Sequence, residues 1–148
     1  MNLLIILLLA AFAAPVTTPA GQSAQVELRG HVVCLDAAGK PARGAAACDG
    51  ANVRFALATG DGKLHYFSPD DVATAMFTDA RVRRRELQIS AQAVKDQLEI
   101  VRLQSVREGK LYDIYYFCEL CNIRAYAPGL CPCCRNEMEF RETPATDQ

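Results

Sequence analysis

The sequence lacks most of the features by which enzymes and nucleic-acid-binding proteins are recognised. It has no glycine-rich phosphate loop, no nucleophile elbow and no H-E-x-x-H metal motif. Its two histidines, His31 and His65, lie on predicted strands without a spaced catalytic partner, which favours structural roles and a protein that is not an enzyme. The formal net charge is only -1, so charge gives no support for binding to nucleic acid or to an anionic membrane.

Charge is also absent from the start of the chain. Residues 3–16 form an uncharged and mostly apolar run, shorter than the roughly 20 residues that a membrane-spanning helix needs. Small residues suited to cleavage follow, although no basic residue precedes the run. We expect residues 1–25 to be a signal peptide and lead-in, with an uncleaved anchor as the alternative. The protein is then periplasmic or secreted, with no stable membrane span after cleavage.

The remaining chain has the composition of a folded protein, because 51% of the residues are hydrophobic and 22% are charged. The glycine at position 30 predicts a bend or bulge in the first strand, and a shift in apolar parity at Val101 predicts another bulge. Alternation of apolar and polar residues predicts strands over residues 26–34, 53–57, 63–67, 86–91 and 98–103, with a further strand over 111–117.

A short helix is predicted between the third and fourth of these strands. Ser68 suits the N-cap, and Pro69 with the acids at 70–71 suits the first turn of a helix that ends near Phe77. This helix-start chemistry explains the paired acids without catalysis. The order of the elements resembles the oligonucleotide/oligosaccharide-binding (OB) barrel over residues 26–106, and that resemblance implies a scaffold rather than a function. The basic cluster of Arg81 and Arg83 to Arg85 is interpreted as a solvated entry to the fourth strand, with an anion or partner site as the alternative.

Cysteine is abundant, and export would place it in an oxidising compartment. Seven cysteines occur in 148 residues. Cys34 and Cys48 bracket a turn-rich connection, and we predict a disulfide between them, with two separate buried thiols as the alternative. The chain-entropy contribution of such a loop of about 15 residues is roughly 3 kcal/mol.

The other five cysteines lie within residues 118–134. Four of them follow the pattern C-x2-C, nine residues, C-x2-C, in which each close pair can direct two thiolates to one tetrahedral ion. We predict Pro128 and Gly129 at the centre of a type II turn that brings the two pairs together. Cys133 is left over, as a buried residue, a redox thiol or an exchangeable ligand. The predicted metal ligands are Cys118, Cys121, Cys131 and Cys134, with zinc as the expected ion and copper or iron as alternatives.

The segment from Tyr116 to Glu139 resembles the short heavy-metal-binding domain of copper-efflux adaptors and metal-transporting ATPases. The shared pattern is Y-x-C at its start and P-G-x-C-P-x-C near its end, followed by a methionine, here Met138. This chain has Cys121 near the place of the family's histidine, and Arg135 where the family has glycine. These changes move the expected site toward an all-thiolate zinc ribbon.

Together these features predict a mainly β fold: a five-stranded OB-like barrel with one short helix, followed by a small zinc-ribbon-like hairpin module. We expect the barrel over residues 26–112, the cysteine module over 113–141 and a disordered tail over 142–148. The predicted function is an exported metal-binding protein of the cell envelope, with the metal ion and an envelope protein as partners. The alternatives are a thiol–disulfide redox protein and an OB-type binding module in which the ribbon is a structural staple.

Overall fold

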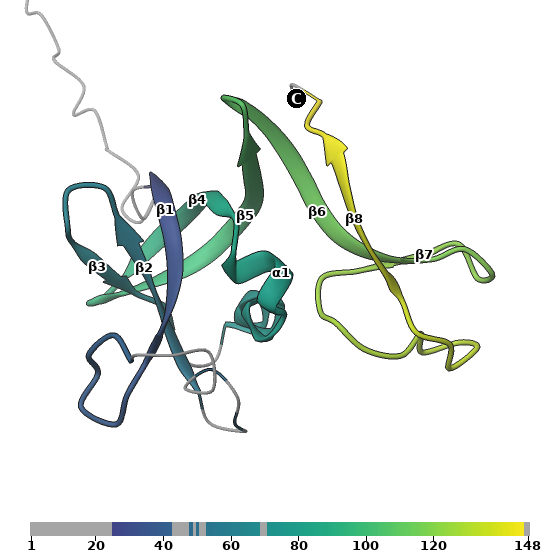
Figure 1. Cartoon of the computed structure of the whole chain (residues 1–148), viewed down its shortest axis with the longest axis horizontal. Helices are drawn as coiled ribbons and strands as arrows, with labels where there is room; N and C mark the ends of the chain where they lie inside the picture. Colours follow the sequence, from purple (N-terminus) through teal and green to yellow (C-terminus); the bar gives the residue numbers. More distant parts are fainter. Residues whose placement is uncertain (1–24, 43–47, 49, 51–52, 69–70, 147–148) are drawn as a thin grey trace, which may run out of the picture.

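The computed structural model describes residues 25–42, 48, 50, 53–68 and 71–146, so the predicted signal segment lies almost wholly outside the described part. The described chain is mainly β, as predicted (Figure 1). Between β3 and β4 lie a 3-10 helix, η2 (Val72–Thr78), and a single helical turn, α1 (Ala80–Arg83). The strands are β1 (Gln25–Leu35), β2 (Arg54–Thr59), β3 (Leu64–Tyr66), β4 (Glu86–Val94), β5 (Gln97–Arg107), β6 (Lys110–Cys118), β7 (Ile123–Ala125) and β8 (Glu139–Pro144).

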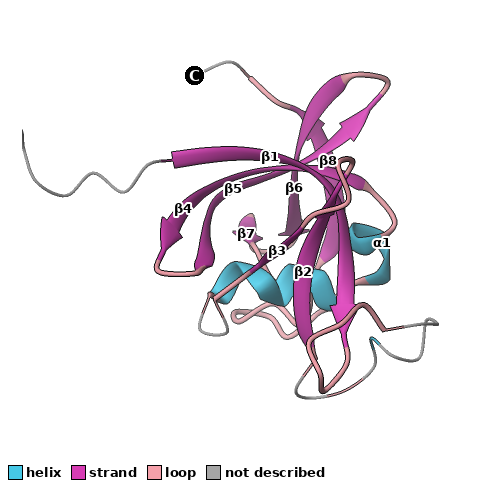
Figure 2. Ribbon diagram, turned by 90° about the vertical axis from the view of Figure 1, so that its left-hand side faces the viewer, coloured by secondary structure: helices cyan, strands magenta, loops and turns pink. Residues whose placement is uncertain are grey.

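These strands form one eight-stranded antiparallel sheet that is not closed into a barrel. The order is β3-β2-β1-β4-β5-β6-β7, and β8 pairs with the other side of β6. The sheet curves over the helical segment (Figure 2), and β3 approaches β5 through a parallel bridge between Phe67 and Leu98. Because β3 is only three residues long, this contact remains a single bridge rather than the ladder that a closed barrel requires.

The bulge predicted at Val101 is confirmed, whereas at Gly30 the register of β1 is continuous and the glycine is required by a close contact between strands. A Cβ atom at Gly30 would lie 2.1 Å from the carbonyl oxygen of Ala58, so only glycine fits where β1 passes from its pairing with β4 to its pairing with β2. In β5, Ile100 and Arg102 pair with neighbouring residues of β4, which leaves Val101 as the bulged residue.

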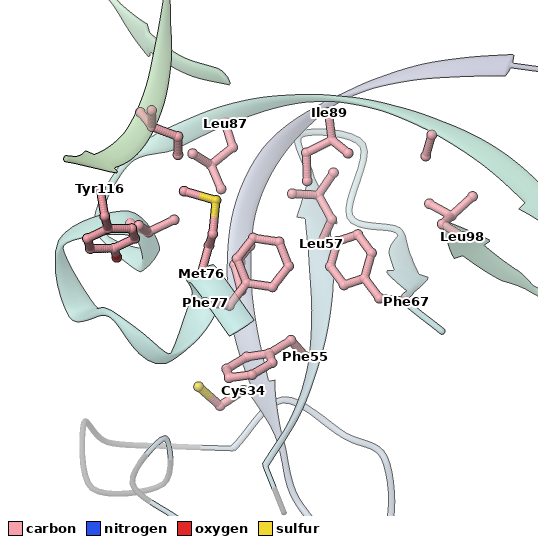
Figure 3. Close-up of a cluster of buried hydrophobic side chains, with 14 of the residues drawn as sticks. Cys34, Phe55, Leu57, Phe67, Met76, Phe77, Leu87, Ile89, Leu98 and Tyr116 are labelled. Atoms are coloured by element: carbon pink, nitrogen blue, oxygen red, sulfur yellow. The ribbon is translucent and has the colours of Figure 1, made fainter. Parts of the chain in front are cut away.

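The core of the β1–β5 region is aromatic and is completed by the helical segment (Figure 3). Phe77 of η2 lies between Phe55 and Phe67, with ring centroids 5.7 Å and 5.1 Å away. The helix begins later than predicted. Its N-cap is Asp71, whose Oδ1 accepts the Ala73 amide at 2.9 Å, rather than Ser68, and residues 69–70 lie outside the described part. The aspartate side chain is the better cap here because its second oxygen also accepts an amide of β5.

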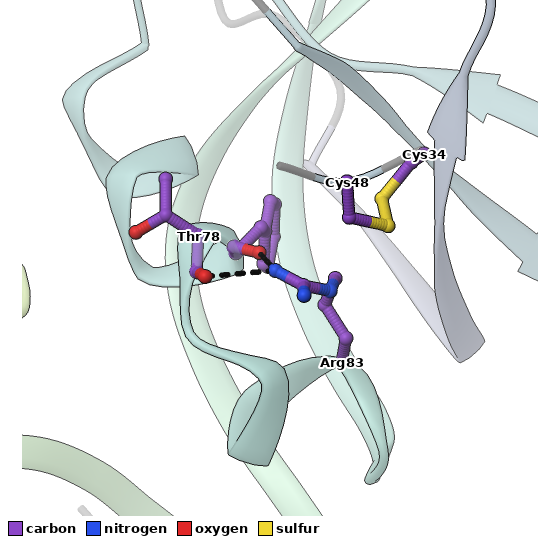
Figure 4. Close-up of a disulfide and its surroundings, with 5 residues drawn as sticks. Cys34, Cys48, Thr78 and Arg83 are labelled. Atoms are coloured by element: carbon purple, nitrogen blue, oxygen red, sulfur yellow. Dashed lines mark hydrogen bonds between the residues drawn. A yellow bond between two sulfur atoms is a disulfide. The ribbon is translucent and has the colours of Figure 1, made fainter. Parts of the chain in front are cut away.

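The basic cluster is not the solvated strand entry that we expected. Arg81 and Arg83 belong to α1. The side chains of Arg81, Arg83 and Arg85 make directed bonds within the fold, whereas Arg84 is exposed. Arg83 donates to the carbonyl oxygens of Phe77 and Thr78, close to the predicted disulfide of Cys34 and Cys48, which is present (Figure 4). The cluster therefore fixes the helical segment in place.

The C-terminal strands differ from the predicted division of the chain. Strand β6 runs without a break across the expected boundary at residue 112. Strand β8 includes residues 142–144, which we had expected to be a disordered tail, because Glu142 pairs with Ile114 and binds Arg85. Among the described residues, the helices are all too short to cross a membrane.

Candidate metal centre

The four cysteines of the C-x2-C pairs come together at one point of the fold. The Sγ atoms of Cys118, Cys121, Cys131 and Cys134 all lie within 4.8 Å of one another, and those of Cys118 and Cys134 are 3.5 Å apart. Zinc–sulfur bonds of about 2.3 Å at tetrahedral angles require sulfur atoms roughly 3.8 Å apart. The cluster thus has the size of a four-thiolate site, and it is able to bind a metal ion.

The first cysteine pair is positioned by the β6–β7 hairpin. Cys118 is the last residue of β6 and pairs with Ile123 at the start of β7. Cys121 lies in the turn between them, and Asn122 completes the turn with a φ of 54°. Asparagine adopts this left-handed conformation more readily than most residues. The hairpin therefore directs both sulfur atoms to the same side.

The second pair repeats this arrangement in a shorter hairpin. Leu130 and Glu137 form an antiparallel bridge, and the amide of Cys131 donates to the carbonyl oxygen of Asn136 at 2.8 Å. Arg135 occupies the place that Asn122 has in the first pair, with a φ of 65°. Glycine is the usual residue for this conformation, which gives a physical reason for the glycine of the heavy-metal-binding pattern.

The segment between the two cysteine pairs reverses the direction of the chain, but not through the predicted type II turn. Gly129 has a φ of 141°, whereas the third residue of a type II turn has a φ near 80°. The bend is open, and the carbonyl oxygen of Gly129 accepts instead the amide of Met138 at 3.1 Å. This bond closes the second hairpin, because Gly129 precedes its first residue and Met138 follows its last.

The four thiols differ in burial and in proton affinity. Cys118 and Cys131 are buried, whereas Cys121 and Cys134 are half-buried. The backbone amides of Cys134 and Cys133 outweigh burial and lower the pKa of the Cys131 thiol to about 7. The amide of Cys121 lowers the pKa of Cys118, but burial and the sulfurs of Cys134 and Cys131 reverse this and raise it overall. Binding of a cation would therefore release protons.

Cys133 stands apart from the four. Its side chain is exposed, so the expectation of a buried spacer is wrong. Its thiol and that of Cys134 are the main causes of a raised pKa at Cys121, which places it beside the cluster without making it a member. The four cysteines that the spacing pattern groups are the four whose sulfur atoms converge, and Cys133 lies outside that group.

The sequence did not indicate how the cysteine module is fixed to the rest of the fold. Tyr116 lies two residues before Cys118, and its hydroxyl donates to Oδ2 of Asp79 at 2.8 Å. Hydrogen bonds from Arg81 and Tyr116 overcome burial and lower the pKa of Asp79 to about 2, so the acceptor is a carboxylate. Tyr126, which follows β7, is 60% exposed.

The chain matches no family model, no curated protein and no solved structure. The likenesses to heavy-metal-binding domains and to OB barrels therefore rest on sequence pattern and on strand order. The four-cysteine cluster itself rests on the geometry of the fold.

Proposed function

We propose that this is an exported protein in which Cys118, Cys121, Cys131 and Cys134 bind one zinc ion that stabilises the C-terminal module. The convergence of the four Sγ atoms within 4.8 Å is the observation that carries the proposal. The two hairpins, each with a left-handed residue after its second cysteine, support the interpretation of this set as a zinc ribbon.

A structural role fits this site better than metal transfer. Structural zinc sites have four protein ligands, whereas sites that exchange or react keep a position open. Cys131 is fully buried and Cys118 is 4% exposed, so an incoming acceptor would reach at most the two half-buried sulfurs. The module also has few buried apolar side chains, and small units of this kind commonly depend on a metal.

The presence of both a disulfide and free thiols in the same chain supports export. The Cys34–Cys48 disulfide is typical of an oxidising compartment, and in such a compartment the remaining thiols need protection. A bound zinc ion supplies that protection to four of them. The β1–β5 region provides the scaffold, and its OB-like character is supported by the pairing of β1 with both β2 and β4.

The test is the metal content and intact mass of the mature protein isolated from the cell envelope. We expect one zinc per chain, a native mass above the apo mass by one zinc ion, and one disulfide. A protein of apo mass with disulfides among residues 118–134 would contradict the proposal and would favour the thiol–disulfide alternative. Recovery of the chain only from the cytoplasm would contradict export separately.

A further inference from the structure

A groove opens between the β1–β5 region and the C-terminal module, where β5 and β6 diverge. The two strands pair from Arg107 and Lys110 as far as Gln104 and Asp113, and beyond this point they separate (Figure 1). The groove has a volume of about 710 Å³, within the range of protein ligand sites. Strand β5 and η2 form one wall, and β6, β7 and the following residues 126–127 form the other.

The lining of this groove is unusually apolar for a surface. Three of its side chains are large, hydrophobic and exposed: Val72 at 85%, Val101 at 55% and Tyr126 at 60%. They come from η2, the β5 bulge and the segment after β7, so they are distant in sequence. Exposed apolar side chains gathered around one depression mark an interaction surface more often than scattered ones do.

The groove also has unpaired strand edges. On the side facing the groove, β6 pairs with β5 up to Asp113 and with β7 from Tyr116, so among the described strands Ile114 and Tyr115 have no neighbour there. On the opposite wall, Arg102 and Leu103 of β5 pair only with β4 in the described part of the chain, and Val101 is the bulged residue. Since residues of a strand direct their backbone groups alternately to its two edges, both walls present amides and carbonyls to an incoming strand.

The charged residues of the groove favour an acidic occupant. Arg102 and Asp113 pair with each other at 3.1 Å and close the narrow end. Arg124 lies on the other wall, with its guanidinium 3.8 Å from the ring centroid of Tyr115, and it forms no ion pair with any residue that the structure describes. The net charge of these groups is positive, so it complements a carboxylate.

We propose that this groove binds an extended peptide segment of a partner protein, with apolar side chains at alternate positions and a carboxylate that meets Arg124. The peptide adds as a strand to the free edge of β5 or β6, and its apolar side chains cover Val72, Val101 and Tyr126. This proposal goes beyond the proposed metal site. The two share one part of the chain, because the wall residues 124–127 lie between the two cysteine pairs in the sequence.

The experiment uses the metal-loaded mature chain and a phage-displayed library of random dodecapeptides, from which the strongest binder is synthesised. We expect its sequence to alternate apolar residues and to contain Asp or Glu. Val101→Asp should weaken its affinity about tenfold or more, because a charge then faces the apolar lining. Val94→Asp is the matched control, since Val94 is an exposed residue of β4 outside the groove, and it should leave affinity unchanged.

A second pair of variants tests the charge. Arg124 and Arg141 each stack on an aromatic ring of β6, but only Arg124 lines the groove. Arg124→Gln should weaken binding, whereas Arg141→Gln should not.

A peptide with alternate backbone amides N-methylated should lose affinity if it pairs as a strand. Equal affinities across both variant pairs would overturn the proposal, as would a dimer in sedimentation that Val101→Asp abolishes, because the groove would then be a self-association surface. Metal content, measured for every variant, separates these outcomes from failure of the zinc site.

Discussion

The β1–β5 region and the β6–β8 module differ in which side chains they bury within one sheet. The first has a core of three packed phenylalanines and a disulfide. The second adds only a few apolar side chains to that core, and two of its most buried side chains are cysteines of the candidate metal site, Cys118 and Cys131. The larger region can therefore fold around hydrophobic burial, while under the proposed function the smaller one depends on coordination of the zinc ion.

The two regions are nevertheless joined by polar contacts. Glu142 of β8 accepts two bonds from Arg85, each 2.6 Å long, and a third from Ser105 at 2.7 Å. Its side chain is only 9% exposed, so these bonds are largely shielded from water. The Tyr116–Asp79 bond adds a second connection. Each region can therefore be perturbed separately, and so can the contacts between them.

Removal of the metal should have the largest effect and should be confined to one region. With Cys118→Ser, we expect loss of zinc and loss of protection from hydrogen exchange over residues 118–138, because coordination of structural zinc contributes on the order of 10 kcal/mol. Protection in β1, β2 and β4 should persist. The control is Cys133→Ser, which should retain both zinc and protection. Unchanged exchange after chelation would show that the module folds without metal.

Loss of the buried carboxylate should affect both regions. Glu142→Ala should lower the free energy of unfolding by about 3 kcal/mol in urea titration, since it leaves the Arg85 guanidinium without its partner. The exposed neighbour Glu139 serves as the control, and its replacement by alanine should cost less than about 0.5 kcal/mol.

The same carboxylate predicts a dependence on pH. Arg85 is the main cause of a lowered pKa at Glu142. Its contribution to stability is present above the unfolded pKa of about 4.3 and is lost as the pH falls through the lower folded value. The acid-induced loss of stability should be smaller in Glu142→Ala. An identical pH profile in the two proteins would contradict this assignment.

Removal of the disulfide should affect mainly the β1–β5 region. Replacement of both Cys34 and Cys48 by alanine removes a crosslink between residues 14 apart, and we expect a loss of about 3 kcal/mol in the free energy of unfolding. Zinc content should stay at one per chain. A fall in metal content together with stability would show that the disulfide and the cysteine cluster are coupled.

The smallest effect concerns one backbone conformation of the metal module. Arg135→Gly should stabilise the metal-bound protein by about 0.5 to 1 kcal/mol, because Arg135 has a φ of 65° that glycine adopts without strain. Thermal unfolding of the loaded protein measures this. The contrasting variant is Arg84→Gly, because Arg84 ends α1 with a negative φ of -78°, and there glycine should be destabilising.

The sequence predicted the features that depend on local chemistry. The bulge at Val101 and the Cys34–Cys48 disulfide follow from residue type and short spacing, and both are present. The convergence of the two C-x2-C pairs was predicted in the same way, since each pair is formed by one turn.

The missed features depend on contacts between distant parts of the chain. Residues 142–148 are polar apart from Pro144 and an alanine, a composition typical of a tail, yet residues 142–144 belong to β8 because β6 offers an edge and Arg85 offers a partner. Nothing near residue 85 in the sequence identifies Glu142, 57 residues away, as the partner of Arg85. The unclosed sheet likewise depends on the position of β3 relative to β5, which periodicity does not determine.

The position of the disulfide also has a consequence for biosynthesis. A chain is made from its N-terminus, so Cys34 and Cys48 are available to each other before residues 118–134 have been delivered. If the chain is exported during synthesis, in line with the proposed function, the first pair can oxidise before the five cysteines with which it could mispair reach the oxidising compartment. The order of the cysteines along the chain would then separate in time the pair that oxidises from the four that we propose bind zinc.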